Sequence, residues 1–111
     1  MFVKQMAYVF KGLIDKAYKK RGIETNTSAL YEDSQGNECQ LTPTENDCSA
    51  WVEVRKDGTV VVRIMQEVLY RGSTFLRMLD NIEIEVQQIG FRFVDHGYQG
   101  DFYQMTFIPE E

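Results

Sequence analysis

No apolar run in this sequence approaches the ~20 residues that a helix needs to span a bilayer. A secretory signal is also missing, because Lys4, Gln5 and Lys11 interrupt the apolar residues near the N-terminus and no small-residue cleavage site follows. We therefore expect a cytoplasmic protein that has no membrane partner. In that compartment Cys39 and Cys48 are expected to be reduced thiols.

Motifs that mark catalysis or metal binding are absent too. The chain contains no Gly-x-Ser-x-Gly, no Walker glycine loop and no Cys-x-x-Cys. The two cysteines are nine positions apart, which is outside the short spacing of common ligand pairs. These absences predict no catalytic residues, no metal site and no cofactor. The alternative is a small enzyme that uses Cys39 or Cys48 as nucleophile and His96 as base.

The most informative absence is that of Lys and Arg from residues 22 to 54. The preceding 21 residues contain six basic groups against Asp15 alone, a net charge of +5. The segment itself has a net charge of −7, from Glu24, Glu32, Asp33, Glu38, Glu45, Asp47 and Glu53. The total of −5 hides this separation. A field of one sign attracts partners of the opposite sign, and an acidic total argues against bulk affinity for nucleic acid.

The composition that is present suits one globular domain. The chain has 111 residues, of which 43% are hydrophobic and 13% aromatic. That content is enough for one real core and excludes a fully disordered chain. We expect a single domain over residues 1–111.

The first 22 residues predict a helix. Apolar residues recur at steps of three and four, which is the period of an amphipathic helix, at Val3, Met6, Phe10, Leu13 and Ala17. Lys19, Lys20 and Arg21 fall in the last turn, where cations favour the helix dipole. Gly22 is placed to end the helix as a left-handed cap. The regular stripe favours a core helix over a membrane-surface helix.

Residues 23 to 50 are polar and poorly periodic. Ala29 to Tyr31 and Cys39 to Leu41 flank a polar turn and predict a short hairpin. Thr42 to Glu45 has capping-box spacing with proline at the first helical position, so a single helical turn is expected at 43–48.

A second hairpin is predicted around Lys56-Asp57-Gly58. A three-residue turn with Gly58 left-handed places Val54 opposite Val60, and Val52 opposite Val62. A two-residue turn would instead place Val52 opposite Arg63. Because the first register collects the apolar residues on one face, we predict a type I turn with a glycine bulge.

The remaining residues predict a helix and a third hairpin. Residues 73 to 89 fit a helical stripe with Ser73 and Gly90 at its ends, although 82–86 also alternate like a strand. Phe91 to Asp95 and Asp101 to Ile108 predict strands around a turn at 96–100, with Phe93 opposite Tyr103. The element order predicts an α+β fold, with an antiparallel sheet of four or more strands and two helices packed on one face.

We expect a non-enzymatic acidic module that binds a basic surface of another protein. Basic sites are common on proteins that handle nucleic acid, so an inhibitor that occupies such a site is a concrete form of this hypothesis. In size and charge the chain resembles small acidic inhibitors made by phages and mobile elements. Carboxylates would pair with Arg or Lys and aromatic rings would anchor the interface. The candidate contacts are Tyr31, Glu32, Asp33, Glu38, Glu45, Asp47 and Trp51.

Two further alternatives come from other classes. The chain could be a structural subunit that forms a homodimer or larger homo-oligomer, through sheet-edge pairing or through its long helix. It could also bind single-stranded nucleic acid through an aromatic sheet face made of Phe91, Phe93, Tyr98 and Tyr103.

Overall fold

The computed structural model describes residues 3–22, 27–41, 49–65 and 73–110. In these residues the chain forms two helices and one six-stranded sheet. The elements are α1 (Val3–Lys20), β1 (Thr27–Glu32), β2 (Glu38–Gln40), β3 (Ala50–Val54), β4 (Val60–Met65), α3 (Ser73–Gln88), β5 (Phe91–Gln99) and β6 (Phe102–Pro109).

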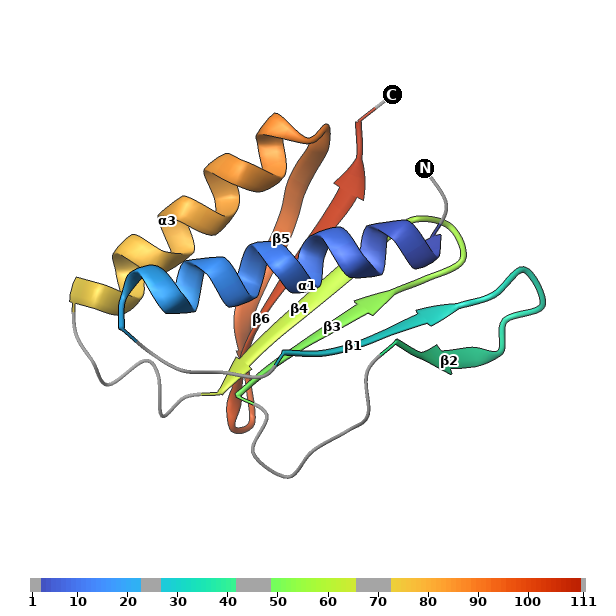
Figure 1. Cartoon of the computed structure of the whole chain (residues 1–111), viewed down its shortest axis with the longest axis horizontal. Coiled ribbons are helices and arrows are strands. Elements are labelled where there is room, and N and C mark those ends of the chain that lie inside the picture. The colour runs from blue at the N-terminus through green and yellow to red at the C-terminus, as the bar shows by residue number, and fades with distance from the viewer. Residues whose placement is uncertain (1–2, 23–26, 42–48, 66–72, 111) are drawn as a thin grey trace.

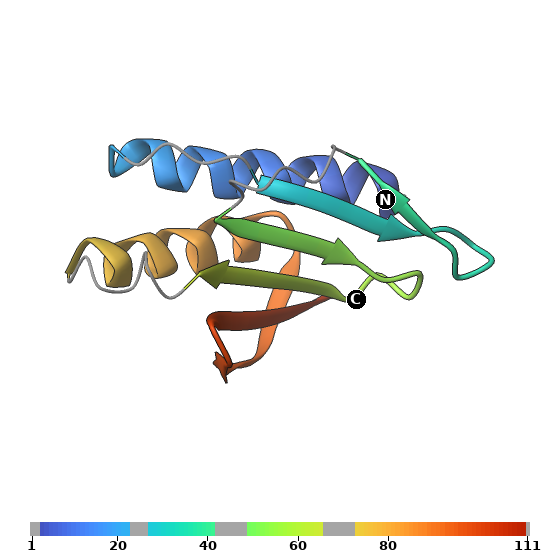
Figure 2. The same ribbon diagram turned by 90° about the horizontal axis from the view of Figure 1, so that it is seen from below.

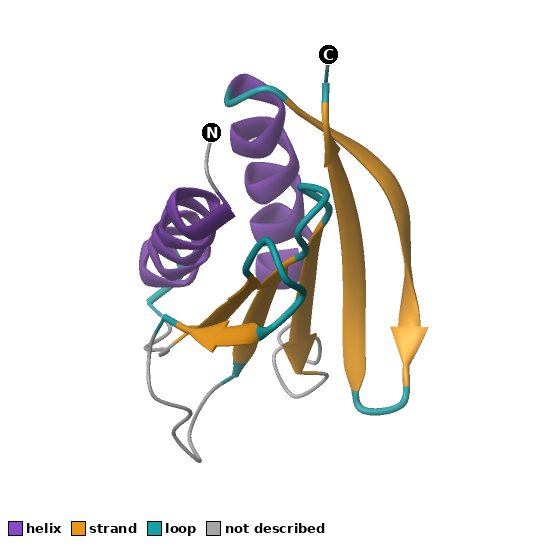
Figure 3. Ribbon diagram, turned by 90° about the vertical axis from the view of Figure 1, so that its right-hand side faces the viewer, coloured by secondary structure: helices purple, strands orange, loops and turns teal. Residues whose placement is uncertain are grey.

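Both helices lie on the same face of the sheet, as the side view in Figure 3 shows. The strand order is β2-β1-β3-β4-β6-β5. Helix α1 packs over β1 and β3, and α3 packs beside α1 and over β5 (Figure 1). Figure 2 shows β1, β3 and β4 side by side, with the β5–β6 hairpin continuing the sheet beyond β4. The α+β class and the packing of both helices on one face are therefore confirmed.

One strand pair departs from the antiparallel pattern. All neighbours in the sheet are antiparallel except β1 and β3, which are parallel. The β1–β2 hairpin occupies one side of β1 and leaves the other side for β3. Parallel pairing sets Ala29 level with Val52, and Tyr31 level with Val54, beneath α1. Burial of these side chains under one helix explains the parallel pairing. Parallel strands are not joined by a tight turn, so no turn motif in the sequence predicts the pair.

Helix α1 follows the predicted stripe. Its buried residues are Met6, Ala7, Phe10, Leu13, Ile14, Ala17 and Tyr18. Phe10 is fully buried, with its ring 5.0 Å from Phe91 and 6.0 Å from Phe107. Gly22 has a φ of 70° and its N–H donates to the Lys19 carbonyl at 3.0 Å, so the expected left-handed cap is confirmed.

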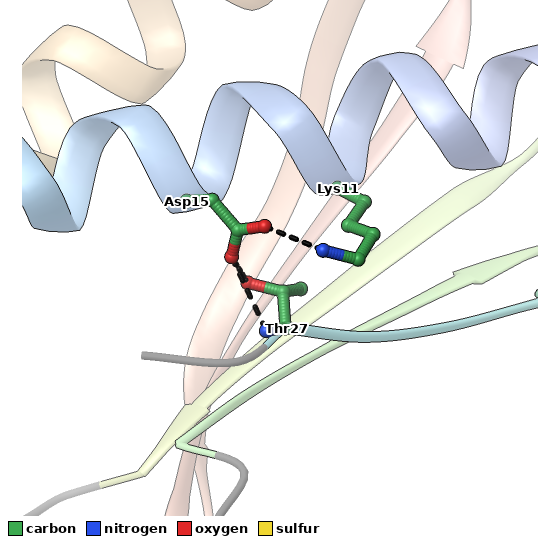
Figure 4. Close-up of polar contacts among 3 residues, drawn as sticks. All are labelled: Lys11, Asp15 and Thr27. Carbon is green, nitrogen blue, oxygen red and sulfur yellow. Dashed lines mark hydrogen bonds and ion pairs between the residues drawn. The ribbon is translucent and has the colours of Figure 1, made fainter. Parts of the chain in front are cut away.

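The Asp15 carboxylate connects α1 to the start of β1 through hydrogen bonds (Figure 4). Asp15 Oδ1 accepts hydrogen bonds from the backbone N–H of Thr27 at 3.2 Å and from its hydroxyl at 2.5 Å. Lys11, one helical turn away, pairs with Asp15 Oδ2 at 2.6 Å. Because Thr27 is buried, these bonds satisfy polar groups that would otherwise be stranded away from water.

The turn between β3 and β4 has the predicted register. Val54 is opposite Val60, Val52 is opposite Val62, and Trp51 is opposite Arg63. Gly58 has a φ of 92°, and its N–H donates to the Arg55 carbonyl at 2.9 Å. A left-handed residue at the third turn position is the mark of a type I turn with a glycine bulge.

Residues 73 to 89 resolve in favour of the helix. Met78, Leu79, Ile82 and Val86 are buried, at helical spacing, and Gly90 has a φ of 90°. The strand-like alternation at 82–86 is overridden because Ile84, which alternation would bury, is exposed on the helix surface.

The third hairpin is longer than predicted, and its predicted register is wrong. Strand β5 runs through Gln99, and the turn consists of Gly100 and Asp101 alone. Phe93 is opposite Phe107 and Tyr103 is opposite Tyr98, with a bulge between Phe93 and Asp95. Gly100 has a φ of 59° and Asp101 has no positive φ, which fits a type II′ turn. Gly100 therefore forms the two-residue turn with Asp101, and Gly97, which was expected in the turn, lies within β5.

The single-turn helix expected at 43–48 lies outside the described residues.

Candidate functional site

The sheet face that no described helix covers is the candidate site, and we call it the open face. Side chains alternate along a strand, so residues between core positions point to the open face. On β3, Val52 and Val54 are buried in the core, and Trp51 and Glu53 therefore point the other way. Its partly exposed side chains, by register, are Leu30, Glu32, Trp51, Glu53, Arg63, Met65, Phe102, Gln104 and Thr106.

Two aromatic rings lie in contact on the open face. The centroids of Trp51 and Phe102 are 5.1 Å apart and the rings meet at 86°. The pair spans β4, since Trp51 is opposite Arg63 and Phe102 is opposite Met65. Edge-to-face contact is a favoured geometry for aromatic pairs.

A charged side chain lies beside the rings. Arg63 Nε donates to Oε1 of Gln104 at 3.0 Å, and Nη1 donates to Oε2 of Glu53 at 3.4 Å. These bonds run across β3, β4 and β6. The guanidinium is therefore held in place, and its charge is offset by Glu53.

The β1–β2 end of the open face is acidic. Glu32 and Glu38 are directly opposite each other and on the same face as Leu30. Glu32 Oε1 accepts the backbone N–H of Lys56 at 3.3 Å, and Glu38 is exposed. Like charges that face each other across a strand pair are unfavourable in the free protein. No described cation forms an ion pair with either carboxylate.

Asp33 has a structural task in the same hairpin. Its Oδ1 accepts the backbone N–H groups of Gln35 and Asn37, each at 2.9 Å. These hydrogen bonds, with that from Asn37 the strongest, lower the pKa of Asp33 below its ordinary value. The carboxylate therefore stays ionised and holds the turn that positions Glu32 and Glu38.

The structure divides the predicted contact residues among three places. Glu32, Asp33 and Glu38 gather at the β1–β2 hairpin. Trp51 is on the open face near the start of β1, opposite Ser28. Tyr31 points to the other face and packs against the core. Glu45 and Asp47 lie outside the described residues.

Four residues of the open face were not predicted as contact residues from the sequence: Glu53, Arg63, Phe102 and Gln104. The register of the β3–β4 hairpin already places Trp51 opposite Arg63. The register of this hairpin does not predict which strand pairs with the other side of β4. That strand is β6, which begins 37 positions after the end of β4. Phe102 and Gln104 are therefore visible only in the folded sheet.

The groups of the enzyme alternative are far apart. Cys39 is on β2 and His96 is on β5, the two opposite edges of the described sheet. His96 Nδ1 lies 2.5 Å from the hydroxyl of Tyr103, and Cys39 Sγ lies 3.8 Å from the Asn37 carbonyl. Cys48 is not in the described part of the chain. Within the described residues, no cluster of three or more His, Cys, Asp or Glu could hold a metal ion.

A hollow of about 320 Å³ opens at one end of the sheet, between the start of α1 and the β3–β4 turn. Its polar rim is formed by Lys56 and Asp57, and its walls are mainly apolar. Asp57 Oδ1 accepts the N–H of Thr59 at 2.9 Å, and this hydrogen bond is the largest cause of its lowered pKa. Its carboxylate is therefore engaged in the turn.

The aromatic residues of the nucleic-acid alternative are mostly in the core. Phe91 and Tyr103 are buried and Phe93 packs against the core, while Tyr98 is 65% exposed. Stacking of bases needs exposed ring faces, and here Tyr98 alone offers one.

Comparison of the chain with protein-family models, curated proteins and solved structures gives no match. None of the described helices has the length and apolar character needed to cross a membrane.

Proposed function

We propose that this protein is a non-enzymatic binding module that docks its open face on a basic surface of another protein. The observation that carries the proposal is the preformed Trp51–Phe102 pair on a sheet face that also bears Glu32 and Glu38, which form no ion pair among the described residues. Tryptophan is among the residues that dominate binding energies at protein interfaces.

The partner's charge is argued from the carboxylates. Glu32 and Glu38 repel each other in the free protein, and a cation placed between them would relieve that repulsion. An arginine can bond carboxylate oxygens in a bidentate manner, which makes it the expected counterpart. A basic site that normally receives nucleic acid fits this chemistry, so competition with nucleic acid is the specific form that we propose.

Arg63 gives the interface orientation. Its charge is offset by Glu53 within the protein, so it adds directional hydrogen bonds without reversing the acidic character of the surface. A partner docked across the face would meet apolar rings in the middle and carboxylates at the β1–β2 end.

The test is capture of partners from a cell lysate by the wild type and by two variants of equal charge change. Glu32→Lys with Glu38→Lys reverses the acidic end and leaves Asp33 to hold the turn. Asp80→Lys with Gln87→Lys and Gln88→Lys makes the same change of +4 on exposed positions of α3. Glu85 is left intact because it pairs with Lys16 at 3.6 Å and Lys20 at 3.8 Å.

We expect a nucleic-acid-handling protein to be captured by the wild type and the α3 variant and lost with the Glu32 and Glu38 variant. Trp51→Ala should weaken the same complex by about 30-fold or more, the effect of a buried aromatic anchor. Added double-stranded DNA should release the captured protein. Equal capture by all variants would show that the open face is not the docking surface.

A further inference from the structure

The two edges of the described sheet differ in length. One edge is β2, which has three residues and carries the Glu38 carboxylate. The other edge is β5, which has nine residues. Short length and charge are devices that keep an edge strand from pairing with another chain. Strand β2 has both, so β5 is the edge on which pairing is to be considered.

The bulge divides β5 into two halves. Phe91 and Phe93, before the bulge, face the core under α3. Of the residues after it, Gly97 is partly exposed and Asp95, His96, Tyr98 and Gln99 are exposed. We call Asp95–Gln99 the free edge. It contains no lysine and no proline, its one charged side chain is Asp95, and the bulge lies at its start, between Phe93 and Asp95.

Within the described residues, neither a positive φ nor a close contact accounts for the glycine at position 97. Its φ is ordinary, and a Cβ built on it would meet nothing within 4 Å. Glycine weakens a strand because it loses more conformational freedom than other residues when the chain folds. Glycine within a strand marks a bulge, a bend or a site that a ligand or another backbone approaches closely, and the bulge of β5 lies before Gly97, between Phe93 and Asp95.

We propose that the free edge pairs with the free edge of a second copy, antiparallel, about a two-fold axis at Gly97. In this register His96 is opposite Tyr98 of the second copy, and Asp95 is opposite its Gln99. Each pair occurs twice by symmetry. The carboxylate accepts from the amide, the rings face each other, and Gly97 has no side chain to meet its own copy at the axis.

The register follows from the alternation of side chains. Residues opposite each other in an antiparallel pair must point to the same face, so the axis can pass only through a residue of the free edge. An axis at His96 would bring two imidazoles together and use Val94 in the bulge. An axis at Tyr98 would leave Asp95 and His96 unpaired. Only Gly97 engages all five residues, and this self-complementarity favours a second copy over a foreign peptide.

Such a dimer would have a defined layout. A two-fold axis perpendicular to the sheet keeps the helices of both copies on one side. The two open faces would then lie together on the other side of one continuous sheet. The inference does not depend on the proposed function, because it can be tested with the protein alone.

The experiment is sedimentation equilibrium of the full chain over a range of concentrations, with two single variants. The wild type should rise from 13.0 kDa to twice that mass as concentration increases. Gly97→Lys should raise the dissociation constant about fivefold or more, because two lysines meet at the axis. Gln99→Lys should lower it about fivefold, because each lysine faces Asp95 of the other copy.

The two substitutions are matched controls for each other. Both add one lysine on the same strand and the same face, and circular dichroism should show an unchanged fold for both. The gain from Gln99→Lys should disappear at about 1 M salt, where screening acts within ~3 Å. A wild type that stays monomeric up to about 1 mM would overturn the proposal. A shift in the same direction for both variants would also overturn it.

Discussion

The two faces of the sheet are built from the same strands but carry different chemistry. On β3 and β4 the helix-covered face presents Val52, Val54, Val60 and Val62, which are all buried. The open face of the same strands presents Trp51, Glu53 and Arg63, which are partly exposed, and Val61, which is buried. Small β-branched side chains fill the space under a helix without voids, whereas large rings and charges need room and water. The covered face therefore forms the core of the fold, and the open face carries most of the larger and charged side chains of these two strands.

The strongest test of this division is Phe10→Ala on the covered side. Phe10 is fully buried between rings of β5 and β6, so its removal leaves a cavity. We expect the free energy of unfolding to fall by about 3–5 kcal/mol. Chemical denaturation measures it, with Tyr8→Ala as the control, because Tyr8 is 56% exposed on the same helix. Equal losses for both variants would mean that α1 is not held by its apolar stripe.

Gly58→Val tests the turn between β3 and β4, at one end of the covered face. A Cβ at Gly58 would lie 3.1 Å from Pro109 Cγ, and its φ of 92° disfavours any side chain. A loss of about 1–3 kcal/mol in unfolding free energy is expected. Gly12→Ala is the matched control, because Gly12 is helical with open space around it and alanine should stabilise the helix by up to about 1 kcal/mol. Unchanged stability of the Gly58 variant would contradict the observed turn.

Trp51→Ala tests the open face for its share in stability. The ring is half-buried against Phe102 alone among described aromatic rings, so we expect a loss of about 1 kcal/mol. A double-mutant cycle with Phe102→Ala should give a coupling of about 0.5–1.5 kcal/mol. A loss as large as that of Phe10→Ala would remove the distinction between the two faces.

Arg63→Met should have the smallest effect. The side chain of Arg63 is 35% exposed and that of the paired Glu53 is 21% exposed, so water screens their attraction. Methionine retains the apolar stem of the side chain, and we expect the unfolding free energy to change by less than about 1 kcal/mol. Thermal denaturation of the Arg63→Met variant, compared with that of Glu53→Gln, measures this change. A loss above about 3 kcal/mol would show that the pair behaves as a buried one.

Local signals predicted much of this fold. The α1 stripe, the cap at Gly22 and the Gly58 register depend on residues within a few positions of each other, and all are confirmed. The helix from Ser73 is confirmed as well, because its stripe spans more residues than the competing alternation. In the last hairpin, the turn predicted at 96–100 was too long, because residues 96–99 belong to β5 and the turn consists of Gly100 and Asp101.

Pairings between distant strands could not be predicted. The parallel β1–β3 pair and the contact of β4 with β6 join segments with no turn between them. They are set by which strands bury their side chains under the same helix. For the candidate site, the acidic hairpin was visible in the sequence, but the neighbour of Trp51 was not, because Phe102 arrives from the last strand.

The position of β6 has a consequence for the protein during its synthesis. Strand β6 is the last strand in chain order, yet it lies between β4 and β5. Before β6 has been synthesised, the edge of β4 has no partner on that side. Strand β4 is apolar except for Arg63 and contains no proline or glycine. Such an edge is prone to aggregate. A nascent chain stalled before Asp101 would therefore need a chaperone more than the finished chain does.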